Sequence, residues 1–166
     1  MTEVSENLKQ LRPGLWETVN QRYPGSMITK HDPVPAAKLR LGLSGARLCF
    51  VTSSGVQLRG SMPFDVVHPI GDFTYRAVPS AAAPSELAIH QLKYPTHGAM
   101  EDINVVFPIE RLAELVRSGE LGALTENFFS FIGYNMDPAR VEGEFAENLA
   151  DAVSAERPDA VLLAPA

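Results

Sequence analysis

The sequence predicts an α/β fold, a three-layer domain with a mainly parallel sheet and flanking helices. The apolar runs that are typical of buried strands lie at 47–52, 87–89, 128–132 and 159–163. Amphipathic segments that suit helices lie at 108–118 and from Asp137 to Arg157. Strands that alternate with helices of this length indicate parallel pairing.

Length and composition limit the class of protein. A chain of 166 residues with 45% hydrophobic residues is long enough for one domain with a proper core. We expect this domain at 41–166, after an irregular N-terminal extension at 1–40. Apolar residues of the extension that could form a stripe on short helices are Leu8, Leu11, Leu15, Trp16 and Val19.

Charge and cysteine content exclude several functions. The net charge is −6 and no Lys/Arg cluster occurs, which argues against nucleic-acid binding. A single cysteine, Cys49, excludes a disulfide framework and fits a reducing compartment. No apolar run approaches the roughly 18 residues of a membrane span, and the N-terminus lacks a signal-peptide pattern. We therefore expect a cytoplasmic protein.

The first predicted strand, at 47–52, runs into the tight, hydroxyl-rich turn Ser53-Ser54-Gly55. Glycine at the third position allows a positive φ there. Residues 56–72 are predicted to be a long loop. The alternating segment 73–78 suits an exposed edge strand, which Pro79 ends.

A second short strand at 87–89 ends at His90, and a helix at 108–118 follows. Pro108 suits the first helical position because its missing N–H would have no partner there, and Gly119 is a natural stop. The buried face of the helix is predicted to hold Ile109, Leu112, Ala113 and Val116.

After the apolar strand at 128–132, Asp137-Pro138 has the pattern of an N-cap and first helical residue. The buried stripe of this helix is predicted to be Val141, Phe145, Leu149 and Ala152. Arg157-Pro158 ends the helix, and the strand at 159–163 follows.

Ligands of parallel α/β sheets bind beyond the carboxyl ends of the strands. The segments expected to converge there are Ser53–Gly55, the loop from His90, Gly133-Tyr134 and Ala164–Ala166. The loop from His90 is dense in titratable groups, which favours a functional site.

Several blocks resemble the selenoprotein B family of the glycine, sarcosine, betaine and D-proline reductases. They are residues 51–58, 71–79, 102–112, 131–134 and 159–163, in the same order. The resemblance covers roughly residues 46–166, and its most specific block is Asp102–Leu112. The wider layout is also similar to racemase-like or flavodoxin-like folds, which is an analogy of fold alone.

The resemblance implies reductive cleavage of a C–N bond in a small amine or amino acid. The family attacks the carbon with a selenocysteine, or a cysteine in its place, directly after the strand that corresponds to 159–163. No cofactor is expected in this chain itself, and that residue is expected just after Ala166. One hypothesis is that the chain ends at a selenocysteine codon. Expected partners are a small amine or amino-acid substrate and other reductase subunits, one of which supplies electrons.

The same resemblance suggests roles for individual residues. The turn Thr52, Ser53, Ser54 and Gly55 is expected to hold a substrate carboxylate, as a nest of backbone amides does. His90 or His97 is expected to be the acid for the leaving amine, with Asp102 orienting it or binding the ammonium group. Tyr94, Asn104 and Tyr134 are expected to complete the substrate site.

Structural alternatives stand beside these roles. The serine segment has the pattern of an ordinary turn, and His90 or His97 could be a backbone-satisfied or surface residue. Asp102 and Asn104 could only cap the following helix. Arg76 is either an exposed edge-strand charge or a substrate clamp. The spacing of the acidic and histidine residues matches no metal motif, so we expect no metal site.

Two further functions remain open. One is a non-catalytic ligand-binding or assembly subunit with the same fold. The other is a racemase-like enzyme, which would need two opposed thiols that Cys49 alone does not provide. The apolar strand Val161–Leu163 would leave an uncovered sheet edge, so we also expect a homo-oligomer.

Overall fold

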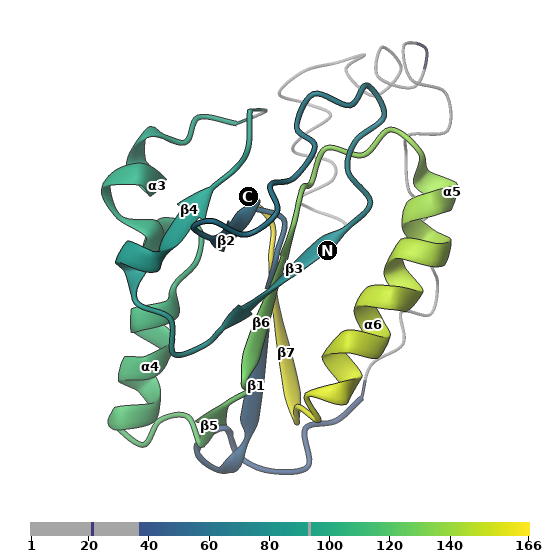
Figure 1. Ribbon diagram of the computed structural model, residues 1–166. Coiled ribbons are helices and arrows are strands. Elements are labelled where there is room, and N and C mark those ends of the chain that lie inside the picture. The colour runs from purple at the N-terminus through teal and green to yellow at the C-terminus, as the bar shows by residue number, and fades with distance from the viewer. Residues whose placement is uncertain (1–20, 22–36, 93) are drawn as a thin grey trace, which may run out of the picture.

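The computed structural model describes residues 21, 37–92 and 94–166. In it a twisted sheet stands between helix α4 (Ile109–Arg117) on one side and helices α5 (Pro138–Arg140) and α6 (Ala146–Ala155) on the other (Figure 1). The predicted α/β class and mainly parallel sheet are confirmed. Most of the predicted extension at 1–40, including its apolar stripe, lies outside the described residues.

Strand β1 (Arg47–Thr52) lies at the centre of the main sheet. On one side it pairs in parallel with β5 (Ala123–Leu124) and then β6 (Asn127–Phe131). On its other side it pairs in parallel with β7 (Ala160–Ala164). Strand β3 (Tyr75–Pro79) runs antiparallel along β6 and forms the outer edge there, as predicted for the segment that Pro79 ends. All four carboxyl ends of the parallel strands thus point to one end of the sheet.

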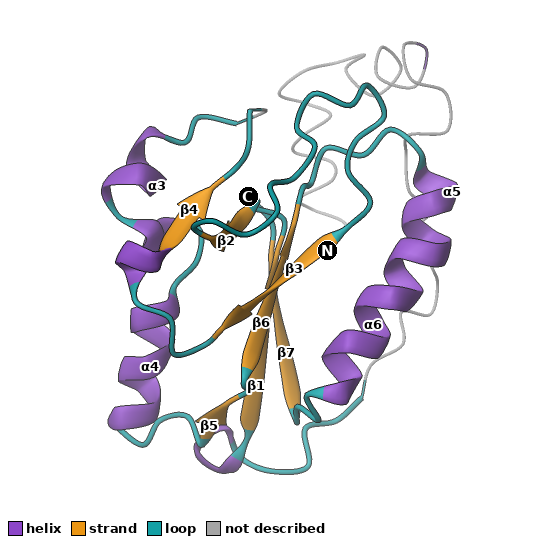
Figure 2. Cartoon of the chain, in the orientation of Figure 1, coloured by secondary structure: helices purple, strands orange, loops and turns teal. Residues whose placement is uncertain are grey.

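A separate two-stranded sheet lies beside the main one, formed by β2 (Val56–Leu58) and β4 (Leu87–Ile89) in antiparallel pairing (Figure 2). The prediction of a loop throughout 56–72 was therefore wrong for its first three residues. The apolar run at 87–89 is a strand, as predicted, but it does not join the parallel sheet. The turn at Gly55 sends the chain out of the main sheet, and the His90 amide donates to the Gly55 carbonyl oxygen over 2.8 Å.

The helices begin and end close to the predicted positions. Pro108 is the N-cap of α4 rather than its first helical residue, and Gly119 follows the helix with a φ of +78°. Asp137 caps α5 as predicted, because its side chain accepts from the Arg140 amide at 3.1 Å. A π-helical turn, Val141–Phe145, joins α5 to α6.

The remaining helical segments are short. The polar segment that was expected to be a loop contains α3 (His97–Glu101) and the 3₁₀ turn η3 (Ile103–Val105). Two other 3₁₀ turns are η1 (Leu43–Gly45) and η2 (Pro84–Glu86). None of the described helices combines the length and the apolar character that crossing a membrane needs.

The core is divided between the two faces of the sheet because side chains along β1 alternate. Leu48 and Phe50 pack in the cluster that faces α4, and Cys49 and Val51 pack in the cluster that faces α6. The α4 side is the larger cluster. Its buried members are Leu48, Phe50, Val56, Val78, Leu87, Phe107, Ile109, Leu112, Leu121 and Phe128.

Candidate functional site

The turn after β1 is a buried, polar corner of the molecule. Thr52 is 1% exposed, Ser53 9% and Ser54 0%. The Thr52 hydroxyl oxygen accepts from the Ser54 amide at 3.2 Å, which holds the chain in a tight turn. Gly55 has a φ of +71°, and a Cβ there would lie 2.8 Å from the His90 carbonyl oxygen. Both the positive φ and this close approach require glycine.

Three strand ends meet at this turn. The Ala166 amide, beyond β7, donates to Ser53 Oγ over 3.0 Å, and Ser53 Oγ lies 3.4 Å from the Ala166 carbonyl oxygen. Gly133, beyond β6, lies so close that a Cβ there would be 3.1 Å from Ser53 Cβ. The predicted convergence of Ser53, Gly133 and the residues after β7 is therefore present.

An apolar hollow of about 310 Å³ opens beside Ser53, on the side of the sheet that faces α6. Its walls come from the ends of three strands and from α6. The lining residues are Val51, Thr52, Ser53, Phe131, Leu149, Leu163, Ala164 and Pro165. A hollow of this size with one hydroxyl at its rim suits a small, largely apolar ligand or part of one.

Two predicted residues from the polar loop reach the turn. The Tyr94 hydroxyl donates to the Ser54 carbonyl oxygen over 2.9 Å, and burial raises the pKa of the phenol. His90 reaches the turn through its backbone, and its Nδ1 atom is buried without a partner among the described residues. Buried polar atoms are normally hydrogen-bonded, so a buried ring nitrogen without a partner is a suitable position for a hydrogen-bonding group of a ligand.

Gln57 is a buried polar residue of β2, two positions beyond Gly55, that sequence reasoning missed. It is 6% exposed, and its Oε1 atom has no partner within the described part of the chain. Gln57 pairs with Ala88 in the β2–β4 ladder, and alternate residues of a strand share a face, so it lies on the same face as His90. Ser54 Oγ is likewise buried without a hydrogen-bond partner among the described residues. The alternation of apolar and polar residues in Val56-Gln57-Leu58 was the sequence signal for a short strand that contains Gln57.

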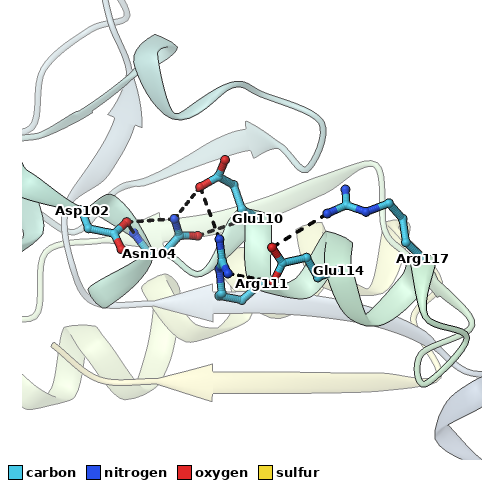
Figure 3. A network of polar contacts seen from close by, with 6 residues as sticks. All are labelled: Asp102, Asn104, Glu110, Arg111, Glu114 and Arg117. Atoms are coloured by element: carbon cyan, nitrogen blue, oxygen red, sulfur yellow. Dashed lines mark hydrogen bonds and ion pairs between the residues drawn. The ribbon is translucent and has the colours of Figure 1, made fainter.

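Asp102 and Asn104 belong to a different polar network, at the start of α4 (Figure 3). Asn104 Nδ2 donates to Asp102 Oδ1 at 2.9 Å and to Glu110 Oε2 at 2.7 Å, and Asn104 Oδ1 accepts from the Glu110 amide at 3.1 Å. These bonds cap α4, so the geometry agrees with the alternative in which Asp102 and Asn104 cap the following helix. The side-chain and backbone hydrogen bonds from Asn104 lower the pKa of Asp102.

The other candidates lie on the surface or in loops. The His97 side chain is 90% exposed and faces Glu101 across 3.4 Å on α3. The Tyr134 hydroxyl donates to the Pro69 carbonyl oxygen at 3.4 Å. Arg76 donates to the Met62 carbonyl oxygen at 2.9 Å and lies over the Phe64 ring, so it fastens a loop to β3. The contacts described for His97, Asp102 and Asn104 do not join them to the serine turn.

Cys49 is enclosed in the core, with 0% of its surface exposed. Desolvation by burial raises the pKa of its thiol, which disfavours the reactive thiolate. Cys49 therefore belongs to the core of the α6 side. Across the ranges that the structure describes, no three His, Cys, Asp or Glu residues gather in a way that could hold a metal ion.

No family model matches the sequence, and no solved structure matches it significantly. Among curated proteins, the chain is similar to the D-proline reductase subunit gamma of Acetoanaerobium sticklandii, with 28% identity over 121 residues. The chain is related to a reductase subunit. The match covers 73% of this chain and 49% of the relative, so the chain spans about half the length of the curated relative it matches.

Proposed function

We propose that this chain is a component of a selenol- or thiol-dependent reductase of the selenoprotein B type. The reductase would cleave a C–N bond in a small amine or amino acid. The similarity to D-proline reductase subunit gamma carries this proposal and makes D-proline the first substrate to test. The convergence of three strand ends on Ser53 supports it, because α/β sheets bind ligands at this edge.

The 166 residues supply binding and positioning in this proposal. The only cysteine is buried with a raised pKa, so the attacking selenolate or thiolate comes from elsewhere. In the family that the sequence resembles, this residue follows the strand corresponding to β7. The contact between Ala166 and Ser53 Oγ supports such a position, since a residue that follows β7 would enter the site beside the serine turn.

The proposed reaction balances with an external reductant. The electron pair of the selenolate forms a bond to the carbon, and the electron pair of the broken C–N bond leaves with nitrogen, which takes a proton. A thiolate or selenolate of a partner subunit then attacks the selenium, and the electron pair of the carbon–selenium bond leaves with carbon, which takes a proton. A second thiol of the partner reduces the selenium–sulfur or diselenide bond formed in this step, which frees the selenol and leaves the partner oxidised. His90 is the proposed proton donor, because its Nδ1 atom is buried without a partner among the described residues. The hydroxyls of the Thr52–Gly55 turn are proposed to hold the substrate carboxylate, because the amides of Ser54 and Gly55 already donate to Thr52 Oγ1 and to the Phe131 carbonyl oxygen.

Partner subunits and a cytoplasmic location form part of the same proposal. A second candidate is a non-catalytic ligand-binding or assembly subunit. The burial of Cys49 favours it, because the described pocket contains no accessible thiol. Both candidates predict that the purified 166-residue chain alone turns over no substrate.

Ligand binding tests the site directly. We expect D-proline to shift the amide NMR signals of Ser53, Ser54 and Gly55 in the isolated chain, and Ser53→Ala to weaken this binding. Ser118→Ala is the matched control, since that hydroxyl bonds a helix carbonyl on the exposed end of α4. Absence of any shift at the turn with D-proline, glycine, sarcosine and betaine would remove the site assignment.

Catalysis separates the reductase from the binding subunit. In the active enzyme assembled with its partner subunits, we expect His90→Gln to lower kcat by about a hundredfold or more, which is the size of a general-acid contribution. His97→Gln is expected to have little effect because that side chain is exposed on α3. Unchanged turnover in both variants would contradict a histidine acid, and an assembled complex without reductase activity would favour the binding subunit.

A further inference from the structure

Gly133 is a glycine for a different reason from most glycines of this chain. A position requires glycine either because its φ is positive or because a side chain has no room there. The described glycines with a positive φ are Gly55, Gly60, Gly71 and Gly119. Gly133 is not among them, but a Cβ there would lie 3.1 Å from Ser53 Cβ and 3.2 Å from Ser53 Oγ. The close approach of the Ser53 side chain is therefore the reason for glycine at this position.

This approach follows from how the chain continues beyond β6. The Gly133 amide donates to the Ser53 carbonyl oxygen at 3.2 Å, and Ser54 forms an antiparallel bridge with Ile132. In this register Gly133 lies directly opposite Ser53. Ser53 lines the hollow on the α6 side of the sheet. The bare Cα of Gly133 therefore faces the one hydroxyl side chain at the rim of that hollow.

The Ser53 hydroxyl has one good hydrogen bond and one weak one. Its oxygen accepts from the Ala166 amide at 3.0 Å, and its hydrogen has the Ala166 carbonyl oxygen as a partner at 3.4 Å. Bonds between a hydroxyl and an oxygen normally span about 2.5–3.0 Å, so a carboxylate oxygen is the better acceptor for this hydrogen. Ser53 is 9% exposed, and a bond formed there is stronger than one in bulk water.

We propose that Gly133 is a positioning residue, which keeps the Ser53 hydroxyl in the orientation that meets a substrate carboxylate. This role rests on the proposed function, in which the hydroxyls of the turn hold that group. Even a methyl group at position 133 would press on both Cβ and Oγ of Ser53. The backbone of the turn is held by the Gly55 amide, which donates to the Phe131 carbonyl oxygen at 2.9 Å. The Ser53 side chain is therefore the group that gives way, by changing its χ1 rotamer.

The orientation of the hydroxyl is measured without any ligand. Three-bond NMR couplings between Hα and Hβ of Ser53 report its χ1 angle. We expect Gly133→Ala to change these couplings. Gly98→Ala is the matched control, because a Cβ at Gly98 would meet no atom within 4 Å, and it should leave them unchanged. Ser53 couplings that stay the same in Gly133→Ala would overturn the proposal.

A double-mutant cycle tests whether Gly133 acts through the hydroxyl. We expect Gly133→Ala to weaken D-proline binding about tenfold, as the loss of a hydrogen bond to a charged group does. In a chain that already carries Ser53→Ala, the same change should weaken binding less than about twofold, because the hydroxyl is absent. Additive losses would overturn the proposal. A chain that binds none of D-proline, glycine, sarcosine and betaine would refute the proposed function, and the Ser53 couplings would still decide whether Gly133 orients the hydroxyl.

A second variant decides the case in which Gly133→Ala does not fold. Ser53→Gly in the same chain removes both side-chain atoms that a Cβ at position 133 would meet. We expect this double variant to recover the circular dichroism spectrum of the unmodified chain. Recovery supports the contact between the two residues, and a double variant that remains unfolded overturns it.

Discussion

At the scale of single residues, Asn104 illustrates how one side chain can hold a local structure together. Its amide nitrogen donates to Asp102 and Glu110, and its amide oxygen accepts from the Glu110 backbone. One residue thus joins η3 to the first turn of α4. The sequence left open whether Asp102 and Asn104 cap a helix or bind a substrate, and the observed bonds account for both side chains as caps.

The first prediction concerns the pKa of Asp102. Its carboxyl group has a pKa below the usual 3.8, and hydrogen bonds from Asn104 are the main cause. We expect Asn104→Ala to raise this pKa toward the usual value, measured by NMR titration of the carboxyl carbon. A pKa lowered by folding stabilises the protein above the unfolded value, and the contribution is lost as the pH falls through the folded value. Asn104→Ala should therefore reduce the loss of stability that protonation of Asp102 causes as the pH falls.

The control for this titration is Glu120→Gln, which removes an exposed carboxylate that accepts from the Ser118 hydroxyl. It should leave the pKa of Asp102 unchanged. An unchanged Asp102 titration in Asn104→Ala would show that these hydrogen bonds are not formed in solution.

At the scale of elements, the turn between β1 and β2 decides where the polar loop lies. Gly55 turns the chain out of the main sheet, and β2 then pairs with β4. This pairing places His90 and Gln57 on one face and joins the His90 backbone to Gly55. The candidate site therefore depends on a single backbone conformation.

The second prediction compares two glycines with similar backbone conformation. Gly55 and Gly60 have φ values of +71° and +80°, but only a Cβ at Gly55 would meet other atoms, at 2.8 Å from the His90 carbonyl oxygen. We expect Gly60→Ala to lower the free energy of unfolding by about 1 kcal/mol through backbone strain. Gly55→Ala should cost about 2–3 kcal/mol, since the clash adds to the strain. Urea denaturation measures both, and equal losses would contradict the close approach.

At the scale of the whole molecule, an aromatic cluster fastens the polar loop to the sheet. Phe107, which follows the Asp102–Asn104 segment, is 0% exposed. Its ring centroid lies 5.5 Å from that of Phe50 on β1 and 6.0 Å from that of Phe128 on β6, in edge-to-face arrangements. Such pairs stabilise beyond the area that they bury. We therefore expect the loop and the centre of the sheet to unfold together.

The third prediction removes this anchor. We expect Phe107→Ala to lower the free energy of unfolding by about 3–5 kcal/mol, as is typical of a large-to-small change in a packed core. Val105→Ala is the control, because Val105 is 68% exposed and should change stability by less than about 0.5 kcal/mol. Thermal and urea unfolding followed by circular dichroism measure the difference. A loss no larger than that of the control would contradict the aromatic packing.

Local sequence patterns determined most of the elements. The buried strand at Arg47–Thr52, the helix that ends before Gly119, and the capped helix at Asp137 all follow from side-chain spacing and from residues with special backbone preferences. These features depend on neighbours a few residues apart, so the sequence alone contains the information. The resemblance to reductases also came from the sequence, and the relative supports it at the level of a reductase component.

Only the tertiary structure decided how these elements meet. Strand β4 has the same apolar character as a parallel strand, yet it pairs with β2, and no local pattern distinguishes the two partners. The burial of Gln57, the separation of Asn104 from the serine turn, and the contact of Ala166 with Ser53 join or separate residues far apart in the chain. The physical reason is that strand partners are selected by long-range packing and backbone hydrogen bonds, which depend on the whole fold at once.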